Sequence, residues 1–350
     1  MTERDALLAL WARNLPVHGD VAAKHQWLYL DSPGGHSEAF LLRAPTGEAV
    51  GCAGIVNREL WSAGHPVRAG LFADISVDRA HRSGLPAIVL QREVKRHVDA
   101  TFDLCYGLPN THAIALYRKL GYHELGKMKR YVRVLRRGGY LARYVAGRQL
   151  PAGLSGAATA CSRAAGALID GPVHLLEVAR ASLSSVTSSL TWLPDFDTRF
   201  DRLWEATRDA VGIACRRDAA FLRWRFSRKP SEQNAIAALI NRTTDRLRAY
   251  AVVRGASGEA AELGDFFGPR DALDDLLTLL PPALYRRGHT SIGVRFLGDP
   301  SIAALLEAHR FSPRDAQRSV IVSQGASGAI ATATLHDPAA WYLTDLDEDT

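Results

Sequence analysis

The chain contains the segment Asn110-Thr111-His112-Ala113-Ile114-Ala115-Leu116-Tyr117-Arg118-Lys119-Leu120-Gly121-Tyr122, which joins a polar cap, a one-faced helix, a tyrosine and a glycine stop. On a helix, its apolar positions fall along one stripe that faces a sheet; they are Ala113, Leu116, Tyr117 and Leu120. Gly121 then ends the helix, because glycine readily adopts the left-handed conformation of a helix C-terminus. The segment therefore predicts a short amphipathic helix that carries a tyrosine towards a sheet.

The order of these residues, Asn then Ala then Tyr then Gly-aromatic, resembles the late motif of the GNAT superfamily of N-acetyltransferases. In that superfamily the tyrosine sits beside the thioester sulfur of the acyl-CoA and acts as general acid. The resemblance implies this role for Tyr117, and it implies that Asn110 and Ala113 lie at the cofactor. An ordinary amphipathic helix with a buried tyrosine is the alternative interpretation.

Length and composition indicate a globular protein of two domains. The chain has 350 residues, more than the roughly 250 at which a single hydrophobic core stops growing. With 47% hydrophobic and 23% charged residues it can bury large cores, which argues against disorder. The net charge of +6 is a weak indication of an anionic partner, because the excess is mostly arginine spread along the chain. We therefore expect no nucleic-acid partner.

The sequence has no pattern typical of a metal centre or a membrane segment. The four cysteines lie about fifty residues apart without a C-x-x-C pair, which argues against a zinc site and a disulfide framework. The start, from Met1 to Asp5, is mixed in charge and leads into a short apolar run, so no secretory signal is expected. No segment approaches the length of a spanning helix. We expect a cytoplasmic protein without a metal and without membrane insertion.

An internal repeat with a period of about 190 residues indicates a domain duplication, because solenoid repeats are much shorter. In each copy an aromatic segment follows a predicted helix: Trp27-Leu28-Tyr29 in the first and Trp224-Arg225-Phe226 in the second. A hairpin follows, and then a buried strand that ends in an acid, so that Asp74 and Asp265 occupy equivalent places. These strands are predicted over 39–43, 49–57 and 71–77 in the first copy, and over 235–241, 247–253 and 262–267 in the second.

Both copies continue with a long helix, a strand, a short helix and a final strand. The long helices are predicted over 87–99 and 272–285, and the final strands over 129–135 and 318–322. This alternation indicates an α/β (α+β) fold of two GNAT-like domains, each a mixed, mostly antiparallel sheet flanked by helices. The predicted boundaries are 1–138 for the first, catalytic domain, 139–193 for a helical linker and 194–350 for a degenerate second domain.

A loop between a strand and a helix is expected to hold the cofactor's pyrophosphate, because the free N–H groups and the dipole of a helix N-terminus attract anions. The segment from Val77 to Ala87 lies in this position. The superfamily pattern is Arg or Gln, two residues, Gly, one residue, then Gly or Ala, and Arg82 and Ala87 fit its two ends. Leu85 departs from the pattern, since it occupies the middle glycine position while Gly84 comes one residue early.

A second register of this loop starts at His81 and places Gly84 correctly, but it puts Pro86 last, where a backbone donor is lost. The Arg82 register keeps Ala87, Leu90, Val94 and Val98 on one helix face. The resemblance implies cofactor contacts from the strand end and from this loop, that is from Ile75, Ser76, Val77, Arg82, Ser83, Gly84, Leu85, Pro86 and Ala87. A capped turn that binds nothing is the alternative.

The predicted mechanism is direct transfer of the acyl group to an amine within a ternary complex. A backbone N–H between Ile75 and Val77 stabilises the oxyanion, and Tyr117 protonates the departing thiolate. Asp74 is the candidate base, or it binds the substrate ammonium; a carboxylate is a poor base unless its surroundings raise its pKa. A carboxylate that caps a neighbouring backbone amide is the alternative interpretation of Asp74.

Candidate acceptor contacts are aromatic and charged residues of both copies, namely Trp27, Tyr29, Trp224, Arg225 and Asp265. A place in the core is the alternative for the aromatic residues. The second copy has no glycine-rich turn of the right length, and Leu306 replaces the tyrosine. Only the first copy is therefore expected to bind the thioester.

Nearly the whole chain is similar to tandem GNAT proteins, and it resembles bacterial double-GNAT proteins, some of which accompany exopolysaccharide or secondary-metabolite genes. The segments His81-Arg82-Ser83 and Trp341-Tyr342-Leu343-Thr344 and the pair Trp27 and Tyr29 carry this closer resemblance. It implies an acyl-CoA donor, with acetyl-CoA the expected one, a small-molecule amine as acceptor and no metal. Two other classes stay open: a Fem-type transferase that uses aminoacyl-tRNA, and a tandem module that binds a ligand without catalysis.

Overall fold

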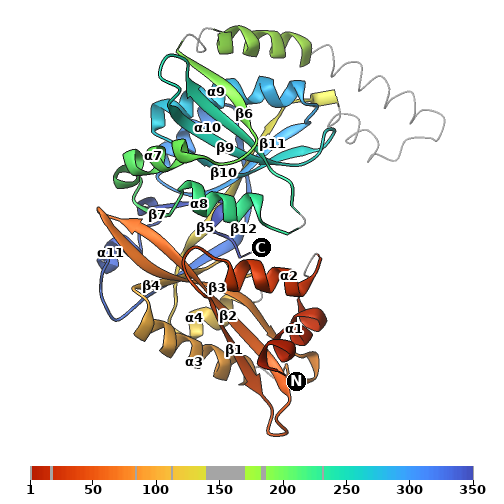
Figure 1. The fold of residues 1–350 in the computed structure, drawn as a ribbon, viewed down its shortest axis with the longest axis vertical. Coiled ribbons are helices and arrows are strands. Elements are labelled where there is room, and N and C mark those ends of the chain that lie inside the picture. Colours follow the sequence, from red (N-terminus) through yellow and green to blue (C-terminus); the bar gives the residue numbers. More distant parts are fainter. Residues whose placement is uncertain are drawn as a thin grey trace, which may run out of the picture.

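The computed structural model describes residues 2–15, 19–82, 85–111, 113–138, 170–182, 187–230 and 232–349. Figure 1 shows two halves stacked along the long axis of the molecule, with β5 and β12 between them. We call the residues up to 138 the first half and the residues from 187 onwards the second half. The order of helices and strands confirms the predicted mixed α/β fold.

The first half follows the predicted order of helix, hairpin, strand, helix, strand, helix and strand. Its helices are α1 (Glu3–Asn14), α2 (Val21–His25), α3 (Leu85–Thr101) and α4 (Ile114–Lys119), and a π-helical turn, Gln26–Leu30, follows α2. Its strands are β1 (Glu38–Arg43), β2 (Ala49–Ser62), β3 (His65–Val77), β4 (Leu104–Gly107) and β5 (His123–Val134). Strands β2 and β3 extend beyond the predicted ranges 49–57 and 71–77 and form a hairpin of their own, whose turn residues Ala63 and Gly64 have positive φ angles of 49° and 86°.

The second half has a similar order, including a π-helical turn, Arg223–Ser227, directly after a short helix. Its helices are α7 (Thr198–Thr207), α8 (Ala219–Leu222), α9 (Arg270–Arg286), α10 (Pro300–Ala308) and α11 (Thr332–Leu335). Its strands are β6 (Ser188–Leu193), β7 (Ile213–Cys215), β8 (Ala235–Asn241), β9 (Leu247–Arg254), β10 (Ala260–Phe267), β11 (Ser291–Gly298), β12 (Ser312–Gln324) and β13 (Trp341–Leu343).

The segment predicted as a linker, 139–193, ends in a strand. Its last residues form β6, which pairs with β8 at the edge of the sheet. The structure describes only residues 170–182 and 187 of the remainder, and 170–182 are helical. Strands β7 and β13 were not predicted from the sequence, because they are too short to show the alternating pattern of a strand.

The strands of both halves join in one sheet of thirteen strands, ordered β13-β7-β2-β3-β4-β12-β5-β11-β10-β9-β8-β6, with β1 paired to β2. Strand β5 of the first half lies between β12 and β11 of the second, and β12 in turn pairs with β4. Each half therefore contributes its late strand to the other. This exchange corrects the expectation of a separate sheet in each domain. The mostly antiparallel character of the sheet is confirmed, because among the described strands only the pairs β3–β4, β10–β11 and β7–β13 are parallel.

Buried apolar side chains form two clusters, one on each side of the first half's sheet. The larger cluster extends through both halves and includes Tyr29 of the first. The smaller cluster lies under α3 and α4 and includes Phe72 and Tyr117. The predicted core face of α3 is confirmed, since Leu90, Val94 and Val98 are buried and Ala87 is half-buried.

Two tryptophans join the halves by a reciprocal contact between the two π-helical turns. The indole N–H of Trp27 donates to the carbonyl of Trp224 at 2.8 Å, and the indole N–H of Trp224 donates to the carbonyl of Trp27 at 2.7 Å. The rings stack with centroids 5.3 Å apart, and the guanidinium of Arg58 lies 4.7 Å from the Trp224 ring. Both indoles are buried with satisfied N–H groups, so this pair belongs to the core.

Candidate active site

The candidate site is a fork in the sheet of the first half. Strands β3 and β4 pair in parallel only from Ala69 with Leu104 to Leu71 with Tyr106. Beyond this point β3 continues to Val77, while β4 ends at Gly107. Among the described residues no other strand pairs with this side of β3, so its last residues lie beside an opening in the sheet. We call this opening the first fork.

A β-bulge distorts β3 where it borders the first fork. Opposite it on β2, Gly54 pairs with Ala73 and Cys52 pairs with Ser76, so that Asp74 and Ile75 together face one residue. Asp74 has a φ of +52°, which is rare for a residue other than glycine. A bulge leaves backbone groups outside the ladder, and Ile75, one of the residues predicted to supply an N–H donor, lies within this one. Ser76 is already back in register on β2.

The carboxylate of Asp74 is buried, and both of its oxygens have a partner. Lys24 Nζ lies 2.5 Å from Oδ1, and the hydroxyl of Tyr29 donates to Oδ2 at 2.9 Å. Burial raises the pKa of Asp74, against the lowering effect of Lys24, and the nearby carboxylate of Asp349 raises it further. The structure therefore brings Asp74 and Tyr29 together as predicted residues of one site, and it adds Lys24, which the sequence did not indicate.

A glycine on β2 makes room for this arrangement. A Cβ atom at Gly54 would lie 1.8 Å from the hydroxyl oxygen of Tyr29. No larger residue fits there while Tyr29 holds Asp74. Tyr29 itself is buried, so it positions the carboxylate and presents no surface to an acceptor.

Tyr117 lies on the other face of the sheet from Tyr29. The cap and the stop predicted for its helix are confirmed: Asn110 Oδ1 accepts a hydrogen bond from Ala113 N–H at 3.0 Å, and Gly121 has a φ of +82°. The Tyr117 ring packs 5.9 Å from Phe72, which borders the first fork, and 5.1 Å from Tyr122. It is only 2% exposed.

Burial raises the pKa of Tyr117 well above its usual value, and the carboxylate of Asp349 raises it further. The phenol is therefore neutral at physiological pH and keeps its proton. Because Asp349 also acts on Asp74, the C-terminal segment lies near both groups. Figure 1 shows the C-terminus between the two halves.

The predicted pyrophosphate loop leads into the N-terminus of α3, a helix of 17 residues. Leu85, Pro86 and Ala87 form its first turn, where proline is tolerated. Ser83 and Gly84 lie outside the described residues. Arg82 is exposed, and its Nε donates to the carbonyl of Val77 at 2.7 Å, which folds the side chain back onto the end of β3.

Two apolar residues at the start of α3 are unusually exposed. Leu85 is 69% exposed and Val89 is 49% exposed. Their spacing of four residues places them on one side of the helix. The N-terminus of α3 therefore presents an apolar surface beside the positive end of a helix dipole, although Pro86 in its first turn has no N–H group.

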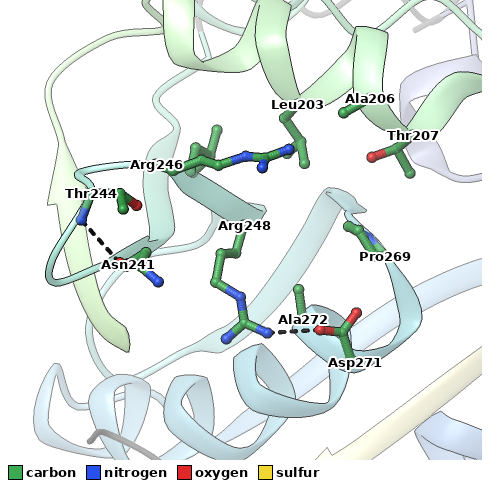
Figure 2. A pocket seen from close by; sticks show the side chains of 11 residues that line it. Leu203, Ala206, Thr207, Asn241, Thr244, Arg246, Arg248, Pro269, Asp271 and Ala272 are labelled. Carbon is green, nitrogen blue, oxygen red and sulfur yellow. Dashed lines mark hydrogen bonds and ion pairs between the residues drawn. The ribbon is translucent and has the colours of Figure 1, made fainter. Parts of the chain in front are cut away.

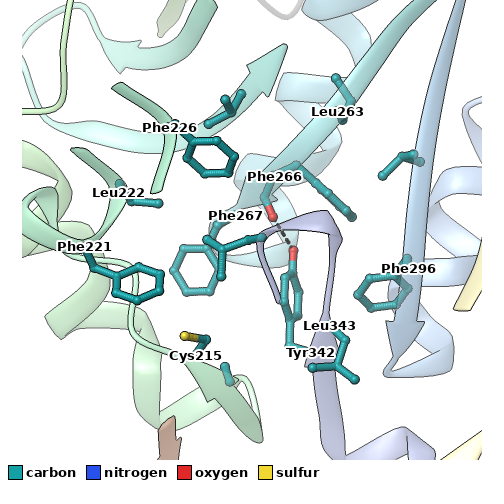
Figure 3. Close-up of a cluster of buried hydrophobic side chains, with 14 of the residues drawn as sticks. Cys215, Phe221, Leu222, Phe226, Leu263, Phe266, Phe267, Phe296, Tyr342 and Leu343 are labelled. Carbon is teal, nitrogen blue, oxygen red and sulfur yellow. Dashed lines mark hydrogen bonds between the residues drawn. The ribbon is translucent and has the colours of Figure 1, made fainter. Parts of the chain in front are cut away.

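The equivalent fork in the second half is filled by the protein itself. Strands β10 and β11 pair in parallel only as far as Leu263 with Val294, and beyond this point β13 pairs with the end of β11. The hydroxyl of Tyr342 on β13 donates to the carbonyl of Phe266 at 2.6 Å, and its ring lies among the phenylalanines of β10 and β11 (Figure 3). This second fork has no space for a thioester.

The predicted acceptor contacts in the second half are corrected by the structure. Asp265 is fully buried and receives hydrogen bonds from Tyr250 at 2.6 Å and Thr344 at 2.7 Å, as well as an ion pair from Arg217 at 3.2 Å. Arg225 is buried and donates to the carbonyl of Leu346 at 2.9 Å, and burial lowers its pKa to about 10. These side chains hold the C-terminal segment.

The predicted acceptor contacts of Trp27 and Trp224 are likewise corrected, because both rings are buried in their reciprocal contact and are not accessible to an acceptor. Sequence reasoning assigned no structural role to Arg217 or to Thr344, which it named only within the segment from Trp341 to Thr344. Neither has a local signal, since both act through partners that are distant in the sequence.

Two cavities of about 460 Å³ each lie in the second half, away from the first fork. One of them borders the start of α9, the position equivalent to the predicted pyrophosphate loop, and is lined in part by Arg246, Arg248, Pro269 and Asp271. Figure 2 shows Arg248 turned towards Asp271, with which it forms an ion pair of 2.8 Å. Pro269 offers no N–H group there. The ion pair with Asp271 offsets the charge of Arg248, which makes this cavity less suited to an anion than its two arginines alone would suggest.

The described residues contain no group of three or more histidine, cysteine, aspartate or glutamate side chains that could hold a metal ion. Within the same residues no helix is long and apolar enough to cross a membrane.

The hydrogen bond from Tyr29 to Asp74 gives a prediction for stability. Its removal in Tyr29→Phe should lower the free energy of unfolding by about 1.5–3 kcal/mol at neutral pH, as for a hydrogen bond to a charged group. Burial raises the pKa of Asp74 above 3.8, the usual value of an aspartate, and the hydrogen bond from Tyr29 opposes this rise. Without the hydrogen bond the pKa of Asp74 in the folded protein is higher, so the loss of stability should grow as the pH rises above 3.8 and the carboxylate ionises. Urea denaturation at several pH values measures both effects.

Tyr122→Phe is the matched control, since its buried hydroxyl has no partner among the described residues. Its removal should cost little at any pH. Equal, pH-independent losses in the two variants would contradict the assigned role of Tyr29.

Comparison with known proteins identifies the fold. No protein-family model matches the sequence, and no curated protein is significantly similar to it. Among solved structures, the chain is similar to a GCN5-related N-acetyltransferase from Anabaena variabilis, with 12% identity, a TM-score of 0.59 and coverage of 91% of this chain and 68% of that one. A GCN5-related N-acetyltransferase from Kribbella flavida has 15% identity, a TM-score of 0.56 and coverage of 92% and 68%.

The structure of Saccharomyces cerevisiae N-myristoyltransferase with bound myristoyl-CoA is also similar, with 13% identity, a TM-score of 0.51 and coverage of 91% and 79%. These identities are too low to carry over an activity, but the likenesses extend over more than nine-tenths of this chain. They show that the chain has the fold of the GCN5-related N-acetyltransferases.

Proposed function

We propose that the protein is an acyl-CoA-dependent N-acyltransferase, with acetyl-CoA as donor and the amine of a small molecule as acceptor. The observation that carries the proposal is the first fork, where a bulge at Asp74 and Ile75 borders an opening in the sheet and the neutral phenol of Tyr117 lies beneath. The GNAT fold supports it, because both GCN5-related neighbours are named as acetyltransferases and the third was solved with an acyl-CoA.

The residues that would hold the donor are those at the start of α3 and at the end of β3. The N–H groups at the helix start and the guanidinium of Arg82 suit a pyrophosphate, and the exposed side chains of Leu85 and Val89 suit the apolar arm. Acyl-CoA supplies an activated acyl group in the form of a thioester. The N–H of Ile75 in the bulge is directed to the oxyanion that develops on the acyl carbonyl.

The chain's own groups account for the proton transfers. Asp74 accepts a proton from the incoming ammonium, and burial helps because it raises the pKa of this carboxylate. Tyr117 donates its proton to the departing sulfur and regains one from the amine nitrogen. The acid and the carboxylate lie on opposite faces of the sheet at the fork, which suits an acid and a base that act on opposite sides of one thioester.

The two halves have unequal roles in this proposal. Residues 1–138 and 194–350 are interpreted as two copies of one GNAT-like unit, supported by their matching π-helical turns and their matching forks. The first copy binds donor and acceptor. The second copy is structural, because its fork is occupied by β13.

Donor binding is the first test of this function. Calorimetry with acetyl-CoA should show binding in the micromolar range, about −8 kcal/mol. The charge reversal Arg82→Glu should abolish it, because a carboxylate beside the start of α3 repels a pyrophosphate.

Arg92→Glu is the control, as Arg92 is an exposed arginine on the solvent side of the same helix. This variant should bind acetyl-CoA like the wild type. Absence of binding to the wild type, or equal loss in both variants, would exclude the assigned donor site.

The role of Tyr117 is tested by Tyr117→Phe. This variant should bind acetyl-CoA normally but turn it over roughly a hundredfold more slowly, as expected for the loss of a general acid. Turnover is followed as the release of free thiol in the presence of a panel of primary amines. Tyr122→Phe, which alters a neighbouring ring of the same cluster, should keep its rate. Unchanged turnover in Tyr117→Phe would remove this residue from the mechanism.

A further inference from the structure

A primary amine of the chain already lies where the acceptor amine is expected. Lys24 is in the last turn of α2, and its Nζ is 2.5 Å from Oδ1 of Asp74. The side chain of Lys24 is 15% exposed and that of Asp74 is 4% exposed, so the pair is largely buried. The ammonium also lies 5.6 Å from the centre of the Trp11 ring. A lysine with this placement has the chemistry of the proposed acceptor class.

The position of Lys24 relative to the bulge is fixed from both sides. Asp74 is the first residue of the bulge, and Ile75, the donor proposed for the acyl oxygen, directly follows it. The hydroxyl of Tyr29 occupies the second carboxylate oxygen, which leaves Oδ1 to Lys24. The amine of Lys24 is therefore held by the residue that directly precedes Ile75, the proposed donor to the oxyanion. It lies on the face of the sheet opposite to Tyr117.

Burial favours a reaction that removes both charges of this pair. A buried ion pair loses hydration on both partners, and this cost offsets much of their attraction. Transfer of a proton from Lys24 to Asp74, followed by acylation of the nitrogen, turns the pair into an amide and a neutral carboxyl group. The raised pKa of Asp74 points in the same direction.

We propose that Nζ of Lys24 is acylated in cis by the acyl-CoA bound at the first fork. This proposal rests on the proposed function and adds a modification site to it. The bond from the acyl carbon to sulfur breaks, and a bond from the same carbon to Nζ forms. The ammonium of Lys24 loses two protons: one goes to Asp74, and the other replaces the proton that Tyr117 gives to the departing thiolate. The products are an N-acyl lysine and free CoA.

The test is incubation of the full chain with acetyl-CoA in the absence of any acceptor, followed by peptide mass mapping over time. Lys24 should gain one acetyl group roughly a hundredfold faster than Lys95, a rate advantage within the range of general acid–base catalysis. Lys95 is the matched control, because its Nζ lies 2.8 Å from a carboxylate oxygen of Asp99 and its side chain is 24% exposed, but its partner is not a residue of the bulge.

Two variants sharpen the result. Lys24→Arg keeps the ion pair with Asp74 but offers no amine, so the fast acetylation should vanish while Lys95 reacts as before. Asp74→Asn removes the proton acceptor and should slow the acetylation of Lys24 to the rate of Lys95. If Asp74→Asn does not fold, Lys24→Arg and the comparison with Lys95 still decide the matter.

Calorimetry on the same sample separates the two ways in which the proposal can fail. If acetyl-CoA binds but Lys24 reacts no faster than Lys95, the modification site is wrong while the proposed function stands. If acetyl-CoA does not bind at all, the proposed function fails and the modification site fails with it.

Discussion

The exchange of strands β5 and β12 is the constraint on which the rest of the structure depends. Strand β12 leaves the second half to pair with β4, and β5 leaves the first half to pair with β11. The chain must then return across the molecule to form β13, which pairs with β7 and β11. Its last residues fill the second fork and bring Asp349 near Asp74. A single C-terminal segment thus closes one fork and reaches the edge of the other.

The two buried acids show how similar surroundings lead to different roles. Each acid lies at an irregularity in its strand and accepts a hydrogen bond from a tyrosine, Tyr29 for Asp74 and Tyr250 for Asp265. The cation beside Asp74 is a lysine that retains some exposure, whereas the cation beside Asp265 is the fully buried Arg217.

An arginine keeps its charge and bonds several acceptors at once, while a lysine can lose its proton and becomes a nucleophile. Arg217 is held between Asp265 and Asp347, and burial raises the pKa of Asp347 to about 6. Removal of one partner from such a buried network leaves an uncompensated charge. The second acid is therefore committed to structure, whereas the proposed function assigns the chemistry to the first.

The parts of the fold that local signals determine could be predicted from the sequence. The cap at Asn110, the stop at Gly121 and the buried face of α3 all follow from residues within one or two helical turns. The strand exchange could not be predicted, because the pattern of β5 is the same whichever strand pairs with it. Lys24 gave no signal either, since a single lysine on a short helix is ordinary. The polar and aromatic run around Trp224 suggested a binding site, but its partners lie in the other half and at the C-terminal segment.

The central claim is that the first fork, and only this fork, takes the thioester. Amide hydrogen exchange of the whole chain with and without acetyl-CoA tests it most directly. Exchange should slow at Asp74 to Val77 and in the first turns of α3, with no change around Asp265 and at the start of α9. Protection confined to the second half, or none in either half at saturating acetyl-CoA, would contradict it.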